Sequence, residues 1–448
     1  MAAAVFVSGS YGRTWTSTQG KKVVADVRKV NSDRTVELVT GRGKSFSVPF
    51  STFSEADVRY LENLLAEKNS DSLHPVSWEK MNRLFDLPIW QDTNLWDDPT
   101  AAVGKRLELK KESKTSFMEN YRSYPQGQAS IIDQPVYALA LYGDTDFANS
   151  LSMFFLNLGD IPPNTNTEKL IEQIEECGEY MEMQLERLLG SPERDSIGTG
   201  DLREKVWRWD WNGHAILLSI QKDKYTAIRI MPLDQAEKGG KTARLSDAEL
   251  KQRMSSCVER RANGDVIITN IPMIDQGPKG YCSPATWERY LRFVDIPADM
   301  YLLALAANTG IGGGTYSENI IKATSNIISS YGRKLGKVGE TPTVDKISLY
   351  IDKGLPVMWT FLSTPQFQRE ATLNTAKRNG WKVEQKYNNS GQNEDTSVSG
   401  HICLIIGYNE TTGEIAISDS WGPAYTERWV AAKAMRGLSY GTMNIIKW

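Results

Sequence analysis

The stretch Asp275–Leu291, DQGPKGYCSPATWERYL, decides how the C-terminal part of this 448-residue chain is interpreted. It places Cys282, one of only four cysteines, after a glycine-punctuated turn and directly before a segment typical of an amphipathic helix. The upstream glycines let the backbone turn tightly, and Pro284 suits the beginning of a helix. Because a helix N-terminus stabilises an anion, this position favours a thiolate. Taken alone, the stretch is also compatible with a buried cysteine that only fills space.

Two later segments supply the groups that a reactive thiolate needs. His401 is the last of three histidines and begins HICLIIGYN, an apolar run that predicts a buried central strand. Asp419 ends the next apolar strand, EIAISDS, after the turn NETTGE. Neighbouring antiparallel strands would bring His401 and Asp419 side by side, so that the carboxylate orients the imidazole that accepts the thiol proton. Gln276 could present its amide NH2, together with the Cys282 backbone N–H, to an oxyanion.

These motifs together resemble those of the papain-like cysteine peptidases, in particular the C39-like branch related to double-glycine leader peptidases. QGPKGYC keeps the family's Q-G-x-x-G-x-C frame, and HICLIIGY keeps Gly-Tyr six and seven residues after the histidine. DSWG stands where papain-like enzymes have N-S-W-G. The resemblance spans roughly residues 270–448. It implies a helical half that holds the cysteine against a sheet that holds the histidine and the aspartate.

The resemblance implies a role for each matched residue. Cys282 would be the nucleophile, His401 the general base and then acid, Asp419 the orienting group and Gln276 the oxyanion donor. Trp421 would be a substrate-binding residue, and it would also shield the Asp419–His401 bond from water.

The chain departs from the family pattern in three places. Lys279 replaces a cysteine that many papains use in a disulfide, and Ser283 replaces an aromatic residue after the nucleophile. Neither change removes a reacting atom. Asp419 in place of asparagine makes the orienting group anionic, which stabilises an imidazolium further. Cys403 follows His401 on the same predicted strand face but lacks a helix terminus, so it is interpreted as a core residue.

The segment NTGIGGGTYSENIIKA leaves two interpretations open. Gly312, Gly313 and Gly314 could expose backbone N–H and C=O groups that pair with an extended peptide. A loop that enters a helix capped by Thr315 with Glu318 explains the same glycines. Analogy with a glycine-lined wall in the family supports the first interpretation, and the three glycines are therefore candidate substrate-binding residues.

A hairpin is predicted around the Asn212-Gly213 turn. His214 stands at its tip without a second histidine or carboxylate at metal-ligand spacing, so a half-buried strand residue is favoured over a metal ligand. Alternating tryptophans on this hairpin could stack on a sugar or peptide, but such a pattern usually covers a sheet face; they are Trp207, Trp209 and Trp211. No metal and no organic cofactor is implied.

Residues 11–68 predict short strands followed by a helix, whose start carries Ser54 and Asp57 at capping-box spacing. The RTWT…G start and the VPFSTFSEADVRYL close resemble the SH3-like homology module of bacterial extracytoplasmic proteins. The resemblance implies a small barrel with a terminal helix, and a possible peptide or cell-wall partner for it.

The whole chain is too long for one ordinary core and is predicted to be a multidomain α+β protein. Residues 69–99 hold three prolines and several turns, which indicates a linker or an ordered strap. Residues 100–262 predict a middle α+β domain that contains a long helix ending at Gly190. Residues 263–448 carry the papain-like motifs.

Charge and hydropathy exclude several classes of partner. A net charge of -3 gives no electrostatic reason to bind nucleic acid or an anionic membrane, and no apolar run is long enough to span a bilayer. The opening MAAAVFVSGS is similar to the tail of a clipped signal peptide but lacks a positive n-region. We therefore expect an extracytoplasmic or secreted protein, with a cytoplasmic location as the alternative.

The expected activity is that of a cysteine peptidase, which hydrolyses peptide bonds of a peptide or protein substrate through a Cys-His-Asp triad and a thioester. One alternative is a catalytically silent papain-like scaffold or peptide-binding protein. The other is an acyl transferase or transpeptidase that uses the same triad and passes the acyl group to an amine.

Overall fold

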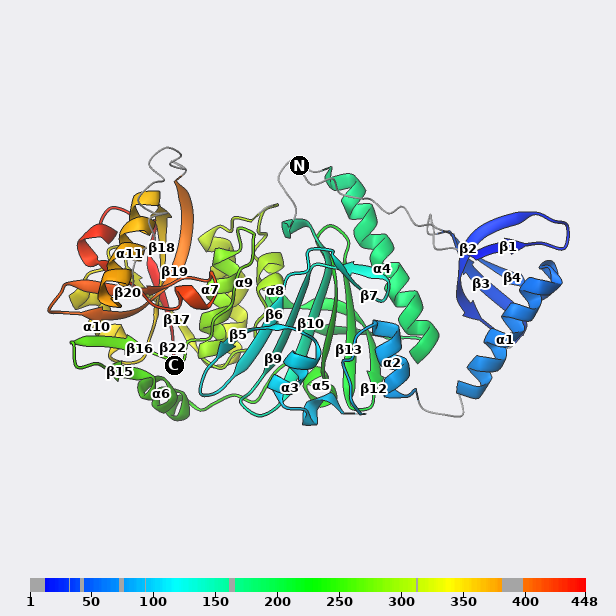
Figure 1. Cartoon of the computed structure of the whole chain (residues 1–448), viewed down its shortest axis with the longest axis horizontal. Coiled ribbons are helices and arrows are strands. Elements are labelled where there is room, and N and C mark those ends of the chain that lie inside the picture. Colours follow the sequence, from blue (N-terminus) through cyan, green and yellow to red (C-terminus); the bar gives the residue numbers. More distant parts are fainter. Residues whose placement is uncertain are drawn as a thin grey trace.

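The computed structural model describes residues 13–31, 33–40, 44–71, 76–92, 94–160, 166–311, 313–380 and 398–448. These residues form a mixed α/β structure with one four-stranded sheet, two larger sheets and a small two-stranded one (Figure 1). Within these ranges, no helix combines the length and the apolar composition that crossing a membrane requires. The segment interpreted as a clipped signal peptide lies outside the described residues.

The N-terminal sheet is an antiparallel meander with strand order β1-β2-β3-β4. A short 3-10 turn and helix α1 follow it, and Asp57 N donates to Ser54 Oγ (3.4 Å) at the start of that helix, which is the N-cap half of the predicted capping box. Ser54 N donates instead to the Thr16 carbonyl oxygen (2.8 Å). Along the described strands the sheet path stays open, so the SH3-like closed barrel is not confirmed. The elements are β1 (Arg13–Thr16), β2 (Lys22–Val30), β3 (Thr35–Val39), β4 (Ser45–Pro49), η1 (Phe50–Thr52) and α1 (Glu55–Asp71).

The middle sheet is antiparallel, with eight strands in the order β11-β12-β13-β14-β10-β9-β6-β5. Helix α4 packs its apolar side on one face of this sheet through Cys177, Met181 and Leu185. The strands are β5 (Lys110–Lys114), β6 (Glu119–Ser123), β9 (Ala138–Gly143), β10 (Ala148–Asn157), β11 (Glu193–Ile197), β12 (Glu204–Trp211), β13 (His214–Gln221) and β14 (Tyr225–Pro232). The other elements are α2 (Trp78–Phe85), η2 (Leu95–Asp97), α3 (Thr100–Arg106), β7 (Ala129–Ile131), β8 (Gln134–Val136), η3 (Leu158–Asp160), α4 (Thr167–Leu189), η4 (Gly200–Leu202) and α5 (Leu233–Glu237).

Two local predictions for this region are confirmed. Helix α4 ends at Leu189, and Gly190 follows it with a φ of 87°. Asn212 and Gly213 form the turn between β12 and β13 with φ values of 43° and 77°, the left-handed conformation that a tight hairpin requires. Local turn chemistry decides both features.

His214 is fully buried, not half-buried as the sequence suggested. Its Nε2 accepts from the Trp90 indole N–H and from the Leu95 backbone N–H, each at 3.1 Å, and its Nδ1 lies 3.0 Å from the Trp211 carbonyl oxygen. Burial lowers the pKa of this imidazole. Because both ring nitrogens have partners, His214 anchors Trp90 and Leu95 to the hairpin, which is a structural role.

The C-terminal sheet follows the order β15-β16-β19-β18-β22-β17, with β20 paired to β19 and β21 paired to β20. Helices α7, α8 and α9 lie between this sheet and the middle sheet (Figure 1). The strands are β15 (Val258–Arg260), β16 (Asp265–Ile268), β17 (Lys334–Gly339), β18 (Val357–Ser363), β19 (Ser399–Asn409), β20 (Glu414–Ser418), β21 (Arg428–Ala431) and β22 (Met443–Lys447). The helices are α6 (Asp247–Ser256), α7 (Cys282–Phe293), α8 (Met300–Ala306), α9 (Ser317–Ser330), α10 (Val344–Ile351), α11 (Pro365–Arg378), η6 (Pro423–Tyr425) and η7 (Ala432–Met435).

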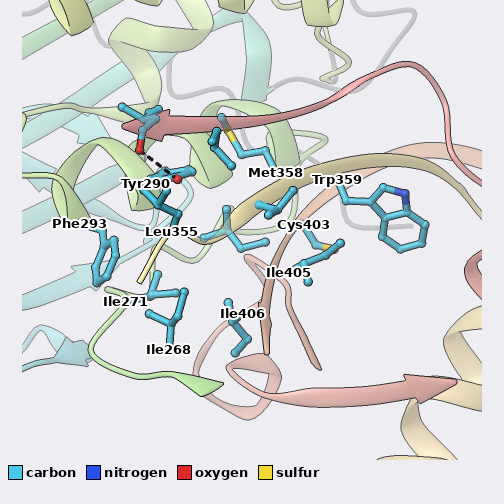
Figure 2. Close-up of a cluster of buried hydrophobic side chains, with 14 of the residues drawn as sticks. Ile268, Ile271, Tyr290, Phe293, Leu355, Met358, Trp359, Cys403, Ile405 and Ile406 are labelled. Atoms are coloured by element: carbon cyan, nitrogen blue, oxygen red, sulfur yellow. Dashed lines mark hydrogen bonds between the residues drawn. The ribbon is translucent and has the colours of Figure 1, made fainter. Parts of the chain in front are cut away.

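The core of this region joins α7 to the sheet. Figure 2 shows Tyr290 and Phe293 of α7 in one cluster with Met358, Cys403 and Ile405 of the strands. The fully buried Cys403 is thus a core residue, as its position in mid-strand indicated, and burial raises the pKa of its thiol. Leu250 and Met254 of α6 belong to the same cluster, and β15 pairs with β16. Residues before the predicted boundary at 262 therefore pack with the last sheet.

Candidate active site

Cys282 is the first residue of α7 and is half-buried. Tyr281 precedes the helix, and its side chain forms no capping hydrogen bond with the first amides. The backbone N–H groups of Ser283 and Ile402 and the imidazole of His401 hydrogen-bond to the Cys282 sulfur. The thiol therefore lies where the N-terminus of α7 meets strand β19.

His401 and Asp419 lie side by side on β19 and at the end of β20. The distance between His401 Nε2 and Asp419 Oδ1 is 2.9 Å, and both side chains are buried. Trp421 stacks on the imidazole with ring centroids 4.6 Å apart, and Phe361 of β18 contacts it edge-on at 5.4 Å. These contacts hold the ring plane, so that one nitrogen faces Asp419 while the ring also hydrogen-bonds to Cys282.

The electrostatics of these three groups favour an ion pair. Burial lowers the pKa of His401, but hydrogen bonds to Asp419 and Cys282 outweigh it and raise the pKa to about 9. Burial raises the pKa of Cys282, but the hydrogen bond to His401 and the charge on that ring lower it by more, so the net shift is downward. Burial also raises the pKa of Asp419, and the contacts with His401 and Arg428 lower it by more. Together these shifts favour a thiolate beside an imidazolium.

Gln276 lies in the turn before Cys282. Its backbone N–H donates to the Ser420 carbonyl (2.9 Å), which places it next to Asp419. Its side-chain Nε2 donates to the Lys279 carbonyl (2.7 Å), while its buried Oε1 has no hydrogen-bond partner among the described residues. The amide is thus held by one of its two N–H groups within the turn that leads to the cysteine.

The glycine-rich segment contacts this turn. Gly314 N donates to the Gly280 carbonyl (3.0 Å), and Gly313 forms a backbone bridge with Gly280. A Cβ on Gly313 would lie 2.3 Å from Gly280 Cα, and its φ of +107° also excludes ordinary side chains, so this close approach requires glycine. Gly312 lies outside the described residues. Helix α9 begins at Ser317 without a side-chain cap, so the predicted cap by Thr315 is wrong.

Two residues of α7 that the sequence did not single out hold the helix against the strands. Thr286 Oγ1 donates to the Ile402 carbonyl (3.2 Å), next to His401. Arg289, which is fully buried, donates through Nη1 to the Ser418 carbonyl (3.1 Å), next to Asp419. These bonds fix the helix that carries Cys282 relative to both partner groups.

Arg428 of β21 is the main electrostatic residue that the sequence analysis missed. Its Nε lies 3.0 Å from Asp419 Oδ2, and the guanidinium is buried. The signal was present, because an arginine inside the apolar run RWVAA needs a buried acidic partner. Its partner could not be named, since the pairing depends on how β20 and β21 align.

The comparison with family models finds a match in the C-terminal part of the chain. Residues 268–444 match the Peptidase_C39 like family, and this match covers less than half of the chain. No curated protein matches the chain. One similar solved structure is the peptidase domain of Streptococcus ComA, a bi-functional ABC transporter involved in a quorum-sensing pathway, with 12% identity and a TM-score of 0.25 over 39% of this chain and 96% of that one. Another is xylellain, a cysteine protease from Xylella fastidiosa, with 11% identity and a TM-score of 0.25 over 43% of this chain and 88% of that one. The family match supports a C39-like peptidase in residues 268–444.

Proposed function

We propose that this protein is a cysteine peptidase that hydrolyses peptide bonds with Cys282 as nucleophile, His401 as general base and acid, and Asp419 as the orienting group. The observation that carries the proposal is the continuous hydrogen-bonded chain from the Cys282 sulfur through the imidazole to the carboxylate, at the N-terminus of α7. The match to a peptidase family over residues 268–444 supports it independently.

The first half of the reaction forms a thioester. The Cys282 thiolate attacks the carbonyl carbon of the scissile peptide bond, and the carbonyl electron pair moves to oxygen. As the first residue of a helix, Cys282 has a backbone N–H without an intrahelical acceptor, which suits it to hold this oxyanion together with the Gln276 amide. The imidazolium of His401 then gives its proton to the departing nitrogen, the C–N bond breaks and an amine leaves.

The second half releases the acid product. Neutral His401 accepts a proton from water as the oxygen attacks the thioester carbonyl. The C–S bond breaks, the thiolate of Cys282 is restored and the imidazolium forms again beside it. Asp419 stays ionised throughout, because His401 and Arg428 both stabilise its negative charge.

Substrate contacts follow from the residues around the thiol. We assign Trp421 the role of covering the His401–Asp419 bond against water, and Gly313 and Gly314 the role of a backbone wall beside the turn of Cys282. The Cβ direction of Gly314 meets no atom within 4 Å, which is compatible with an approaching peptide on that side. An extracytoplasmic or secreted location and a peptide or cell-wall partner for residues 11–68 stay part of the proposal.

The deciding experiment compares the wild type with Cys282→Ala in a peptide-cleavage assay and in active-site titration with a cysteine-directed peptidyl probe. We expect Cys282→Ala to abolish turnover and labelling while the unfolding midpoint in urea stays within the range of the wild type. Cys257→Ala is the matched control, because Cys257 is buried and burial raises the pKa of its thiol.

Each alternative predicts its own result in the same assay. Retained cleavage by Cys282→Ala would refute the assignment. A wild-type protein that binds peptides but neither cleaves them nor reacts with the probe would be a silent scaffold. Coupled products that appear when an amine is added, at the expense of the acid product, would identify an acyl transferase.

A further inference from the structure

The turn that carries Cys282 is attached to the middle sheet as well as to its own helix. Ser113 Oγ accepts from Met273 N (3.0 Å), and Asn120 Nδ2 donates to the carbonyl oxygen of the same residue (3.2 Å). Tyr124 OH donates to the Asp275 carbonyl, and Asn157 Nδ2 donates to Tyr281 OH (3.0 Å). The segment from residue 273 to residue 281 is therefore held by residues of strands β5, β6 and β10 and by Tyr124, which follows β6.

A buried ion pair adds a further contact between this turn and the middle region. Lys279 Nζ lies 2.5 Å from Oδ1 of Asp160, which ends η3 directly after β10. The two side chains are 6% and 10% exposed, so water screens the pair little. Burial lowers the pKa of Lys279, while the charge of Asp160 raises it and so opposes that shift.

Aromatic rings close the remaining sides of the Lys279 ammonium. The ring centroids of Tyr301, Tyr124 and Tyr281 lie 4.3, 4.9 and 5.2 Å from Nζ, within the range of cation–π attraction. Tyr301 OH also accepts a hydrogen bond from this ammonium. This enclosure restricts the Lys279 ammonium to one position. Through the side chain it therefore also restricts the position of the Lys279 backbone.

The Lys279 backbone is hydrogen-bonded directly to Gln276 and to the residue before Cys282. The Lys279 carbonyl accepts from Gln276 Nε2 (2.7 Å) and from Tyr281 N (2.9 Å). The first bond orients the Gln276 amide, which is assigned as the oxyanion donor. The second bond holds the backbone of Tyr281, the residue directly before Cys282. Gly159 packs against Tyr281 so closely that a Cβ there would lie 1.8 Å from the tyrosine oxygen.

We propose that Asp160 of the middle region is a positioning residue for the cysteine chemistry, because its ion pair with Lys279 holds the Gln276 amide toward the oxyanion formed at Cys282. This inference rests on the proposed peptidase function and deepens it. Residues 100–262 then form part of the working catalytic unit, since they supply the acidic half of a pair on which the turn depends.

The test uses the full chain with charge-removing substitutions of similar size, Asp160→Asn, Lys279→Met and the double variant. Asp234→Asn is the matched control, because Asp234 pairs with Lys238 on the exposed surface of the same region (3.0 Å). The measurements are kcat and KM for a cleaved peptide, the affinity for a peptidyl aldehyde, and the rate of Cys282 alkylation by iodoacetamide as a function of pH.

We expect Asp160→Asn and Lys279→Met each to lower kcat by about 10- to 100-fold with KM changed by less than about threefold, because an oxyanion donor acts mainly in the transition state. Aldehyde affinity should fall by a similar factor, since its adduct also carries the oxygen. The pH profile of alkylation should stay as in the wild type, because it reports the thiolate and not the oxyanion donor. The double variant should lose no more than either single variant.

Two results would overturn the inference while leaving the peptidase function intact. One is a kcat of Asp160→Asn equal to that of Asp234→Asn. The other is a parallel loss of kcat and alkylation rate, which would show that the pair only stabilises the fold. A wild-type protein that neither cleaves peptides nor binds the aldehyde would overturn the proposed function and this inference together.

Discussion

Asp419 is shared between two cationic partners, because His401 Nε2 lies 2.9 Å from its Oδ1 and Arg428 Nε lies 3.0 Å from its Oδ2. The carboxylate is fully buried, so removing Arg428 would leave its charge beside the imidazole alone. Arg428 thus favours the anionic form of Asp419 and leaves the other carboxylate oxygen to the imidazole.

Replacing Arg428 by leucine is expected to destabilise the protein and reduce its activity. The buried carboxylate of Asp419 would lose its guanidinium, and breaking a buried pair in this way costs about 3–5 kcal/mol. Urea unfolding measures the stability loss, and kcat/KM for a peptide measures the effect on the reaction. Arg436→Leu, at an exposed position, is the control and should change neither quantity. Equal stability of the two variants would contradict the assigned role of Arg428.

Replacing Asp419 by asparagine is expected to shift the titration of the thiol. Asp419 raises the pKa of His401, and the resulting imidazolium lowers the pKa of Cys282. Without the carboxylate, the pKa for alkylation of Cys282 should move upward, toward the ordinary value of about 8.5. Iodoacetamide kinetics between acidic and alkaline pH test this. An unchanged profile would show that the carboxylate does not control the ion pair.

The activity of the wild type is expected to fall as the pH rises through about 9, the pKa to which His401 is raised. Below that pH the imidazolium carries the proton that the leaving amine needs, and above it the ring is neutral. On the acid side, activity should persist below the usual thiol range, because the Cys282 pKa is lowered. A pH profile of kcat/KM tests both limbs. A fall in activity near pH 7 on the alkaline side would argue against a raised pKa of His401.

Replacing Gly313 by alanine is expected to disturb the turn before Cys282. The new Cβ would lie 2.3 Å from Gly280 Cα at a φ of +107°, and backbone strain of this kind costs about 1–3 kcal/mol. Gly239→Ala is the matched control, because its φ of +67° is also left-handed but no atom lies within 4 Å of its Cβ position. Unfolding by urea and peptide turnover should both suffer more in Gly313→Ala. Equal losses would assign the effect to the backbone angle alone.

Replacing Trp421 by alanine is expected to lower kcat/KM by about tenfold, which corresponds to about 1.4 kcal/mol. The indole stacks on the His401 ring at 4.6 Å, and without it water can reach the bond to Asp419. Trp421→Phe keeps an aromatic face and should retain most of the activity. Steady-state kinetics of both variants test the prediction, and equal rates for alanine and wild type would contradict it.

Local sequence signals predicted several parts of the structure correctly. Apolar periodicity and the glycine at position 190 predicted the end of α4, and Asn212-Gly213 predicted the hairpin of β12 and β13. The amphipathic pattern after Cys282 predicted α7, and the apolar run after His401 predicted the central strand β19. Each of these features depends on residues close together in the chain.

Sequence alone determined which segments carry the cysteine, the histidine and the aspartate, and which elements they begin or end, because helix starts, turns and buried strands are encoded by neighbouring residues. Tertiary structure alone decided that Arg428 faces Asp419, that Asp160 faces Lys279 across 119 positions of the chain, and that β1 to β4 follow an open path. The physical reason is that a buried charge is stable only beside an opposite charge, and several candidates of either sign exist in the sequence. Packing of the sheets and helices selects among them.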